Sequence, residues 1–151
     1  MPIVYTDPTL SNVHSLAVAA NGIFAGLGVS INFVVIPVLR ALGYPAKGWA
    51  VTYDRGKYVA ISTILVSSIS HFYLYHKTGQ SRALYCGLLS LVSAPYTALA
   101  MKPTNTRLQE LEKSKVNVNM NESQALIEKW NMLQWFRTIV GNAAFALALI
   151  E

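Results

Sequence analysis

Arg137 is the residue whose setting in this sequence most strongly suggests chemistry. It stands directly before the apolar segment Thr138 to Ile150, which contains no charged side chain. Leaving a guanidinium in hydrocarbon costs about 2.5–3.5 kcal/mol or more, so this arginine must either face a polar interior or reach the membrane surface with its head group. The sequence leaves both positions open, and the first would place a fixed positive charge among helices.

Several amide and aromatic side chains are expected at the same end of the apolar segments as this guanidinium. They are Asn32, Asn105 and Asn131, with Tyr53 and Arg55 just before the second long apolar stretch. A planar guanidinium with several amides can bind a phenolic or enolic oxygen of a ligand. Any one of these amides alone is more commonly a helix-end cap, so only their combination predicts a binding surface.

The three histidines, His14, His71 and His76, are expected at the opposite end. His71 is the deepest of them and so the best candidate for a general base near neutral pH. His14 with His71 or His76 could ligate haem or a metal, but no His-x-x-His, Glu-x-x-His or Cys-x-x-Cys spacing occurs. We therefore expect no metal ligands, with haem or a metal kept as the alternative.

The composition predicts a membrane protein. Of the 151 residues, 53% are hydrophobic and 13% charged, against about 25% charged in a typical soluble domain. Three stretches, 8–39, 58–76 and 83–101, lack Asp, Glu, Lys and Arg, and each is long enough for a helix that crosses the bilayer. The net charge of +5 comes from residues between these stretches rather than from a continuous basic stripe, which argues against nucleic acid as a partner.

The expected fold is all-α, a single domain over 1–151 that forms a four-helix transmembrane bundle in the lipid bilayer. The helices are predicted at about 12–39, 58–75, 81–101 and 130–150, with a polar loop at about 102–129. Pro37 is expected to close the first helix and Pro103 the third, whereas Pro95 is expected to kink the third. Gly22, Gly26 and Ser30 give the first helix a small-residue face, for internal packing or for a homo-oligomer.

The basic residues also predict an orientation. Ten of them fall in or next to the segments that join the first helix to the second and the third to the fourth, and only Lys77 and Arg82 fall on the other side. By the positive-inside rule these two segments are cytosolic and both termini lie on the non-cytosolic side. We expect a multi-pass integral protein of the endoplasmic reticulum or another endomembrane.

Four sequence blocks resemble successive signatures of the anthrone oxygenase family. They are "FAGLGVSINFVVIPVL", "GWAVTYDRGKYVA", "APYTALAMKPTNTRL" and "EKWNMLQWFRTIVGNAAFALAL". They occur in the family's order and cover most of the chain, and the Pro-Tyr-Thr, Pro-Thr-Asn-x-x-Leu and Trp…Arg-Thr elements are the most specific. Members of this family are small four-helix membrane proteins, numerous in fungi and often encoded with aromatic polyketide pathways.

The resemblance implies a monooxygenase that converts an anthrone, an aromatic polyketide, to an anthraquinone with O₂ and without a bound cofactor. Carried over by motif, with the polar residues discussed above, the expected catalytic residues are Arg137, Asn105, His71 and Tyr53. The expected substrate-binding residues are Trp49, Arg55, Tyr96, Thr97, Arg107, Trp130 and Asn131. In this interpretation a base, which is His71, Tyr53 or a water held by Asn105, removes a proton, and Arg137 stabilises the oxyanion.

Two other interpretations fit the same sequence. The first is a non-catalytic membrane scaffold that recruits biosynthetic enzymes through its basic cytosolic segments. The second is a haem- or metal-binding redox protein of the membrane that uses the histidines. An assay of anthrone oxidation above the background rate in air separates the first from an oxygenase, and a visible absorption spectrum separates the second.

Overall fold

Four long helical rods make up the structure, a computed structural model that describes residues 5–114 and 120–150. The first rod contains α1 (Pro8–Ser30), the π-helical turn η1 (Ile31–Val35) and α2 (Ile36–Ala41), and α3 (Ala46–Thr78) is the second. The third rod contains α4 (Ser81–Leu91), α5 (Ser93–Tyr96), the π-helical turn η2 (Thr97–Met101) and α6 (Lys102–Lys113), and α7 (Met120–Leu149) is the fourth. The described residues contain no strand, so the predicted all-α, four-helix fold is confirmed.

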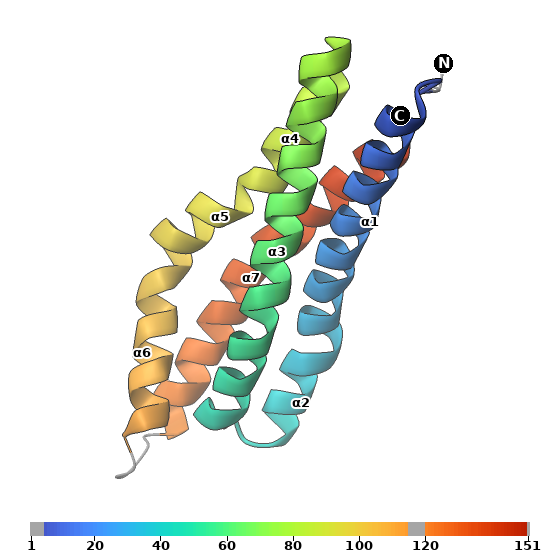
Figure 1. Ribbon diagram of the computed structural model, residues 1–151. Helices are drawn as coiled ribbons and strands as arrows, with labels where there is room; N and C mark the ends of the chain where they lie inside the picture. Colours follow the sequence, from blue (N-terminus) through green and yellow to red (C-terminus); the bar gives the residue numbers. More distant parts are fainter. Residues whose placement is uncertain (1–4, 115–119, 151) are drawn as a thin grey trace.

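The rods pack as a bundle in which both chain ends lie at the same end (Figure 1). α1 packs against α3 and α7, and α4 also packs against α3 and α7. Among the described residues, the helical stretches Pro8–Ala41, Ala46–Thr78 and Ser81–Lys113 are long and apolar enough to cross a membrane. Large apolar side chains such as Phe33, Ile69 and Leu99 point outward, as hydrocarbon surroundings favour.

Three helices begin earlier than the sequence predicted. α1 begins at Pro8, where the side chain of Asp7 accepts a hydrogen bond from the backbone N–H of Thr9 at 2.8 Å. α3 begins at Ala46 rather than near residue 58, and α7 at Met120 rather than near residue 130. The reason is the same for α3 and α7: their first turns are polar outside but carry buried aromatic or aliphatic residues inside, such as Trp49 and Ile127.

The two prolines expected to end helices do not end them. Pro37 and Pro103 each lie in the first turn of an α-helix that directly follows a π-helical turn, α2 after η1 and α6 after η2. Proline lacks an N–H and crowds the carbonyl four residues earlier, and a widened turn before it relieves that conflict. The predicted loop at 102–129 is therefore mostly helical among its described residues, with α6 and the start of α7 on either side of the segment 114–119.

The third rod bows away from α3 at its middle. Its α-helix is interrupted at Val92, three residues before Pro95, and again by η2. Figure 1 shows the consequence: α4 runs beside α3, α5 turns aside, and α6 descends at a greater separation. The predicted kink at Pro95 is confirmed, and prolines and π-turns are the usual causes of such bends.

The buried apolar core lies at the end of the bundle opposite the termini. It joins the first, second, third and fourth rods through Ile31, Ile36, Leu39, Trp49, Met101, Leu108, Ile127 and Trp130. Toward the termini the interior becomes polar: Ser90 donates a hydrogen bond to Asn21 at 2.9 Å, and the Asn21 amide lies 2.9 Å from Nε2 of His71. These contacts tie α1, α3 and α4 together by interhelical hydrogen bonds.

The close contact between α1 and α7 depends on Gly28, which lies outside the predicted small-residue face, and on Gly22, which belongs to it: a Cβ at Gly22 would lie 3.1 Å from Cε2 of Phe145 on α7. Gly28 is buried, and a Cβ there would lie 2.9 Å from Oγ1 and 3.2 Å from Cα of Thr138. Gly26 and Ser30 are exposed, and a Cβ at Gly26 would meet nothing within 4 Å. Internal packing, one of the two predicted roles of this face, is therefore wrong for Gly26 and Ser30, because the packed face of α1 passes through residue 28. A role of these positions in a homo-oligomer stays a prediction.

We predict opposite effects for alanine at these two glycines. Gly28→Ala should destabilise the protein by about 1–3 kcal/mol, because the methyl group displaces α7 or its Thr138 side chain. Gly26→Ala should leave stability unchanged or raise it, since alanine favours a helix by about 1 kcal/mol over glycine. Thermal unfolding of both variants in detergent measures this difference. Equal midpoints would show that α1 and α7 do not pack closely at Gly28.

Candidate functional site

A cavity of about 570 Å³ lies between α3 and the bowed third rod. The bow provides its width, and α1, η1 and α7 form its inner wall. The lining residues are Leu27, Ile31, Thr52, Tyr53, Gly56, Lys57, Ala60, Ile61, Ile64, Leu65, Leu91, Ala94, Thr97, Ala98, Lys102, Asn105, Thr106, Gln109, Trp130 and Arg137. None of these is an acidic residue, so the lining carries a net positive charge.

The cavity is polar at one end and apolar at the other. The α6 wall is polar throughout: Lys102, Asn105, Thr106 and Gln109 follow the i, i+3, i+4, i+7 spacing of one helix face. The α3 wall is polar only at its start, and Gly56 there has no side chain to fill the space. Further along α3 and α4 the lining becomes aliphatic. A ligand with one oxygenated edge and one hydrocarbon edge would match this gradient.

Arg137 lines the cavity without a carboxylate partner among the described residues. One of its terminal nitrogens donates to Oε1 of Gln134 at 3.1 Å, and its guanidinium carbon lies 5.6 Å from the ring centroid of Phe24. Its Nε is buried and has no hydrogen-bond partner. The amide and the aromatic face lower the free-energy cost of burying the guanidinium but do not neutralise its charge. The charge therefore remains available to an anion in the cavity.

Two further lining residues carry buried polar atoms without a hydrogen-bond partner. They are Oδ1 of Asn105 and the indole Nε1 of Trp130. Leaving such a group unpaired costs about 1–3 kcal/mol, so native structures rarely keep several together without a reason. With Nε of Arg137, the residues that line the cavity carry two unpaired donors and one unpaired acceptor. These three atoms are themselves covered by protein.

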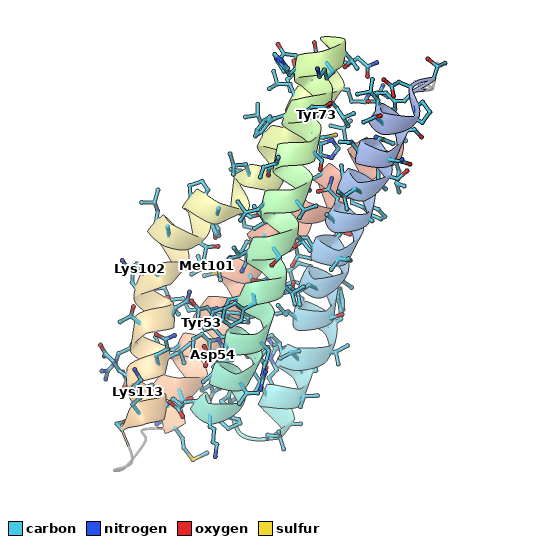
Figure 2. All side chains as sticks on the ribbon, viewed as in Figure 1. Tyr53, Asp54, Tyr73, Met101, Lys102 and Lys113 are labelled. Carbon is cyan, nitrogen blue, oxygen red and sulfur yellow. The ribbon has the colours of Figure 1, made fainter. Side chains whose placement is uncertain are left out.

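Tyr53, which Figure 2 labels on α3, lines the cavity together with a second aromatic residue, Trp130. Its ring stacks on Trp49, with centroids 5.0 Å apart and planes at 13°. Trp49 is fully buried and meets Trp130 edge-on at 5.9 Å. Trp49 therefore holds Tyr53 and Trp130 in place and does not line the cavity, which corrects its predicted role in direct binding.

Two predicted arginines lie outside the cavity. Arg107 is half-exposed and pairs through Nε with Glu122 at 2.6 Å and through NH1 with Glu110 at 3.0 Å. It stands two residues after Asn105, which is about 200° around a helix, so it faces away from the cavity. Arg55 is exposed and is not a lining residue either. Helical continuity through Pro103 is what turns Arg107 outward.

The other predicted binding residues differ in whether they line the cavity. The hydroxyl of Tyr96 donates to the backbone carbonyl of Leu133 at 3.2 Å, and its ring stacks on Phe136. Asn131 accepts a hydrogen bond from the amide of Asn32 at 2.9 Å. Neither Tyr96 nor Asn131 lines the cavity, whereas Thr97 does, and its hydroxyl donates to the Ser93 carbonyl at 2.7 Å.

His71 is not brought to the cavity. It is fully buried beside Asn21, six residues beyond the last α3 lining residue, Leu65, which is about 9 Å along the helix. The structure therefore does not bring His71 together with Arg137, Asn105 and Tyr53, the other predicted catalytic residues, which all line the cavity. Among the described residues, no three His, Cys, Asp or Glu side chains gather as a metal site would require.

Sequence reasoning missed the polar face of α6 beside Asn105. Lys102, Thr106 and Gln109 share this face with Asn105, and they were assigned to a loop because Pro103 was expected to end the helix. The signal was present in their spacing, which is helical from Lys102 onward. This spacing predicts a helix face only if the helix is assumed to continue through Pro103.

The two buried asparagines near this site should respond oppositely to leucine. Asn32 donates to Asn131 and accepts from Thr138, so Asn32→Leu should cost about 1–3 kcal/mol by leaving those partners unpaired. Asn105→Leu should be neutral or stabilising, because it removes a buried oxygen that has no partner. Thermal unfolding of the two variants in one detergent tests this. A large loss for Asn105→Leu would show that its amide is satisfied.

A family model described as anthrone oxygenase matches residues 49–147, which include α7 up to Leu147 and every element of the cavity except α1 and η1. An anthrone oxygenase of Claviceps purpurea (strain 20.1) is 30% identical over 143 residues, covering 86% of this chain and 82% of that protein. The anthrone oxygenase AgnL2 of Paecilomyces divaricatus is 23% identical over 145 residues, covering 86% and 88%. No solved structure matches. With the family model covering well over half of its length, this chain belongs to the anthrone oxygenase family.

Proposed function

We propose that this protein oxidises an anthrone-type phenolic polyketide to the corresponding anthraquinone with O₂. Its family membership supports an oxygenase role in general. The observation that carries the specific proposal is that Arg137, which has no carboxylate partner among the described residues, lines one cavity together with Asn105 and Trp130. Its guanidinium suits an oxygen atom that gains negative charge during a reaction.

The shape of the cavity suits a flat tricyclic phenol. Its volume of about 570 Å³ falls within the range of about 300–1,000 Å³ that small-molecule sites occupy. Aliphatic side chains such as Ile64 and Leu91 would cover the hydrocarbon edge of the rings. The oxygenated edge would then face Asn105 and Arg137 at the polar end.

The first chemical step is removal of a proton from the methylene carbon of the anthrone. This carbon lies between two aryl rings and is conjugated with the opposite carbonyl, so its anion is an aromatic enolate. The base is Tyr53 or a water held by Oδ1 of Asn105, which are the predicted alternatives that the cavity retains. Arg137 stabilises the developing enolate oxygen, and this kind of electrostatic stabilisation is commonly the largest catalytic contribution.

The anion then reacts with O₂ directly. It transfers one electron to O₂, and the resulting carbon radical and superoxide combine and take up a proton to form a hydroperoxide at the former methylene carbon. Loss of the remaining C–H proton and cleavage of the O–O bond give the quinone carbonyl and one water. The substrate supplies every electron in this sequence, so the proposal requires no bound cofactor.

We place the protein as a multi-pass protein of an endomembrane such as the endoplasmic reticulum. The polar end of the cavity then faces the cytosol, because ten of the twelve basic residues belong to that side by the positive-inside rule. The chain termini, which lie together at the other end, would be non-cytosolic.

Two arginines of contrasting position test the role of the guanidinium. Arg137→Ala should lower turnover of emodin anthrone by about 10²-fold or more, because the enolate loses its positive partner. Arg107→Ala is the matched control: it removes the same side chain from an exposed ion pair outside the cavity, and turnover should stay within about twofold. The assay follows quinone absorbance on admitting air to an anaerobic mixture, with the reaction in air alone subtracted. Unchanged turnover in Arg137→Ala would remove it from the mechanism.

The base should also be found at the cavity rather than at the buried histidine. Asn105→Leu should lower turnover by about 10-fold to 10²-fold, since it can no longer hold a water for proton transfer. His71→Gln should retain turnover per folded molecule, because glutamine can keep the hydrogen bond to Asn21. Rates normalised to monodisperse protein distinguish the two. The reverse pattern would return the proton transfer to His71.

A further inference from the structure

The cavity has an apolar opening on its side that the proposed chemistry does not use. Five lining residues are exposed as well as apolar, and we call them the side portal: Ile61 and Leu65 of α3, Leu91 of α4, Ala94 of α5 and Ala98 of η2. Ile61, Leu65 and Leu91 are 55%, 50% and 37% exposed. The portal lies where the third rod turns away from α3 (Figure 1).

Two lysines fix the depth of the portal in a bilayer. Lys57 is the last charged residue before the uncharged stretch of α3, and Lys102 is the first after the uncharged stretch of the third rod. Both line the cavity, on opposite walls. They therefore mark the same membrane surface, since lysine ammonium groups stay at the level of the head groups.

The side portal lies on the hydrocarbon side of these lysines. Ile61 follows Lys57 by four residues and Ala98 precedes Lys102 by four, which is about 6 Å along either helix. Leu91 is eleven residues from Lys102, or about 16 Å. The hydrocarbon core is about 30 Å thick, so the portal opens into one leaflet. The polar lining residues Thr106 and Gln109 lie on the aqueous side of the same level.

A water-soluble ligand would not reach an apolar opening inside a leaflet, because it stays in the aqueous phase. A neutral tricyclic aromatic partitions strongly into hydrocarbon because of its apolar area, and it would be concentrated there. A route from the aqueous end would instead take it past Lys57, Lys102 and Thr106, across polar groups that it cannot satisfy. The geometry and the energetics both favour the portal.

We propose that the aromatic ligand enters and leaves the cavity sideways, from the leaflet that borders Lys57 and Lys102, through the side portal between α3 and the α4–η2 segment. This inference rests on the proposed function for the class of ligand. The exposed residues Leu65, Leu91 and Ala98 border the route of the ligand. The polar end of the cavity orients the ligand once it is bound.

The test measures binding rather than turnover, with unsubstituted anthraquinone as a stable, neutral probe. The protein is placed in phosphatidylcholine nanodiscs, and quenching of tryptophan fluorescence in a stopped-flow instrument gives both rate constants; Trp130 lines the cavity and serves as the reporter. Ala98→Phe narrows the portal and should slow association and dissociation alike by about tenfold, with little change in Kd.

Matched variants separate passage from general disturbance. Leu99→Phe changes the neighbouring residue, which is 81% exposed and does not line the cavity, and should leave the rates unchanged. Thr106→Phe narrows the aqueous side; because Thr106 lines the polar end, this variant can change Kd, but it should not slow association. In the opposite direction, Leu65→Ala widens the portal and should speed both rates, whereas Ile69→Ala, on the same helix but outside the lining, should not.

Each contrary result overturns the inference in a recognisable way. Slower rates in Thr106→Phe but not in Ala98→Phe would place the entrance at the aqueous end. A changed Kd with unchanged association in Ala98→Phe would make Ala98 part of the binding wall. Failure of the wild-type protein to bind anthraquinone would overturn both the class of ligand and the inference, whereas normal binding with no turnover of an anthrone would overturn the proposed function alone.

Discussion

The interruption of backbone hydrogen bonding in the third rod is the constraint on which this structure depends. A continuous α-helix from Ser81 to Lys113 would run close beside α3 over its whole length, and side chains would fill the space between them. Breaks before Pro95 and Pro103 instead bend the rod outward. At the break before Pro95 the backbone groups keep local partners: the N–H of Val92 donates to the carbonyl of Leu88 at 3.0 Å, and the N–H of Tyr96 donates to that of Val92 at 3.2 Å. Such local bonds are what allow a helix to be interrupted in a membrane. The cavity is the volume that this bend creates.

The electrostatics of the cavity depend on which charged side chains have an acidic partner and which do not. The ion pairs between described residues lie at the surface, as in Arg40 with Glu128 and Lys57 with Asp54. Arg137 has only an amide and an aromatic face as partners among the described residues. A carboxylate beside it would stabilise the resting protein but would also compete with an anionic ligand. Keeping the charge uncompensated is costly for folding and useful for stabilising an enolate.

The sequence predicted the fold class and the kink at Pro95, because each depends on a local and strong signal. The roles of Arg137 and Asn105 stay predictions, and the structure places both residues at the cavity. Uncharged runs of sufficient length indicate spanning helices, and a charge next to such a run stands out. It could not predict that Pro103 would allow the helix to continue, because that depends on the π-turn before it, which has no sequence signature of its own. The misplacement of Arg107 followed directly from that single error.

His71 and Trp49 do not line the cavity, and the reason differs from that for Arg107. Both are buried and both have unpartnered ring nitrogens, which are properties that functional and structural residues share. Depth along a helix can be read from a sequence, whereas the direction in which a side chain points depends on which neighbour packs against it. His71 faces Asn21 on α1, and Trp49 faces Tyr53 and Trp130.

The segment Lys102 to Leu111 shows how one short polar sequence serves three surroundings at once. Thr104, Leu108 and Leu111 are buried and lie on one face of α6, which packs against α7. Asn105, Thr106 and Gln109 lie on the next face and line the cavity. Arg107 and Glu110 lie on the third face, exposed, where Arg107 pairs with Glu122 and so joins α6 to α7 across the segment 114–119. A helix rotates by 100° per residue, so these roles alternate closely along the chain. An ordinary turn after the apolar stretch could place side chains in at most one of these three surroundings. The helix that continues past Pro103 places them in all three.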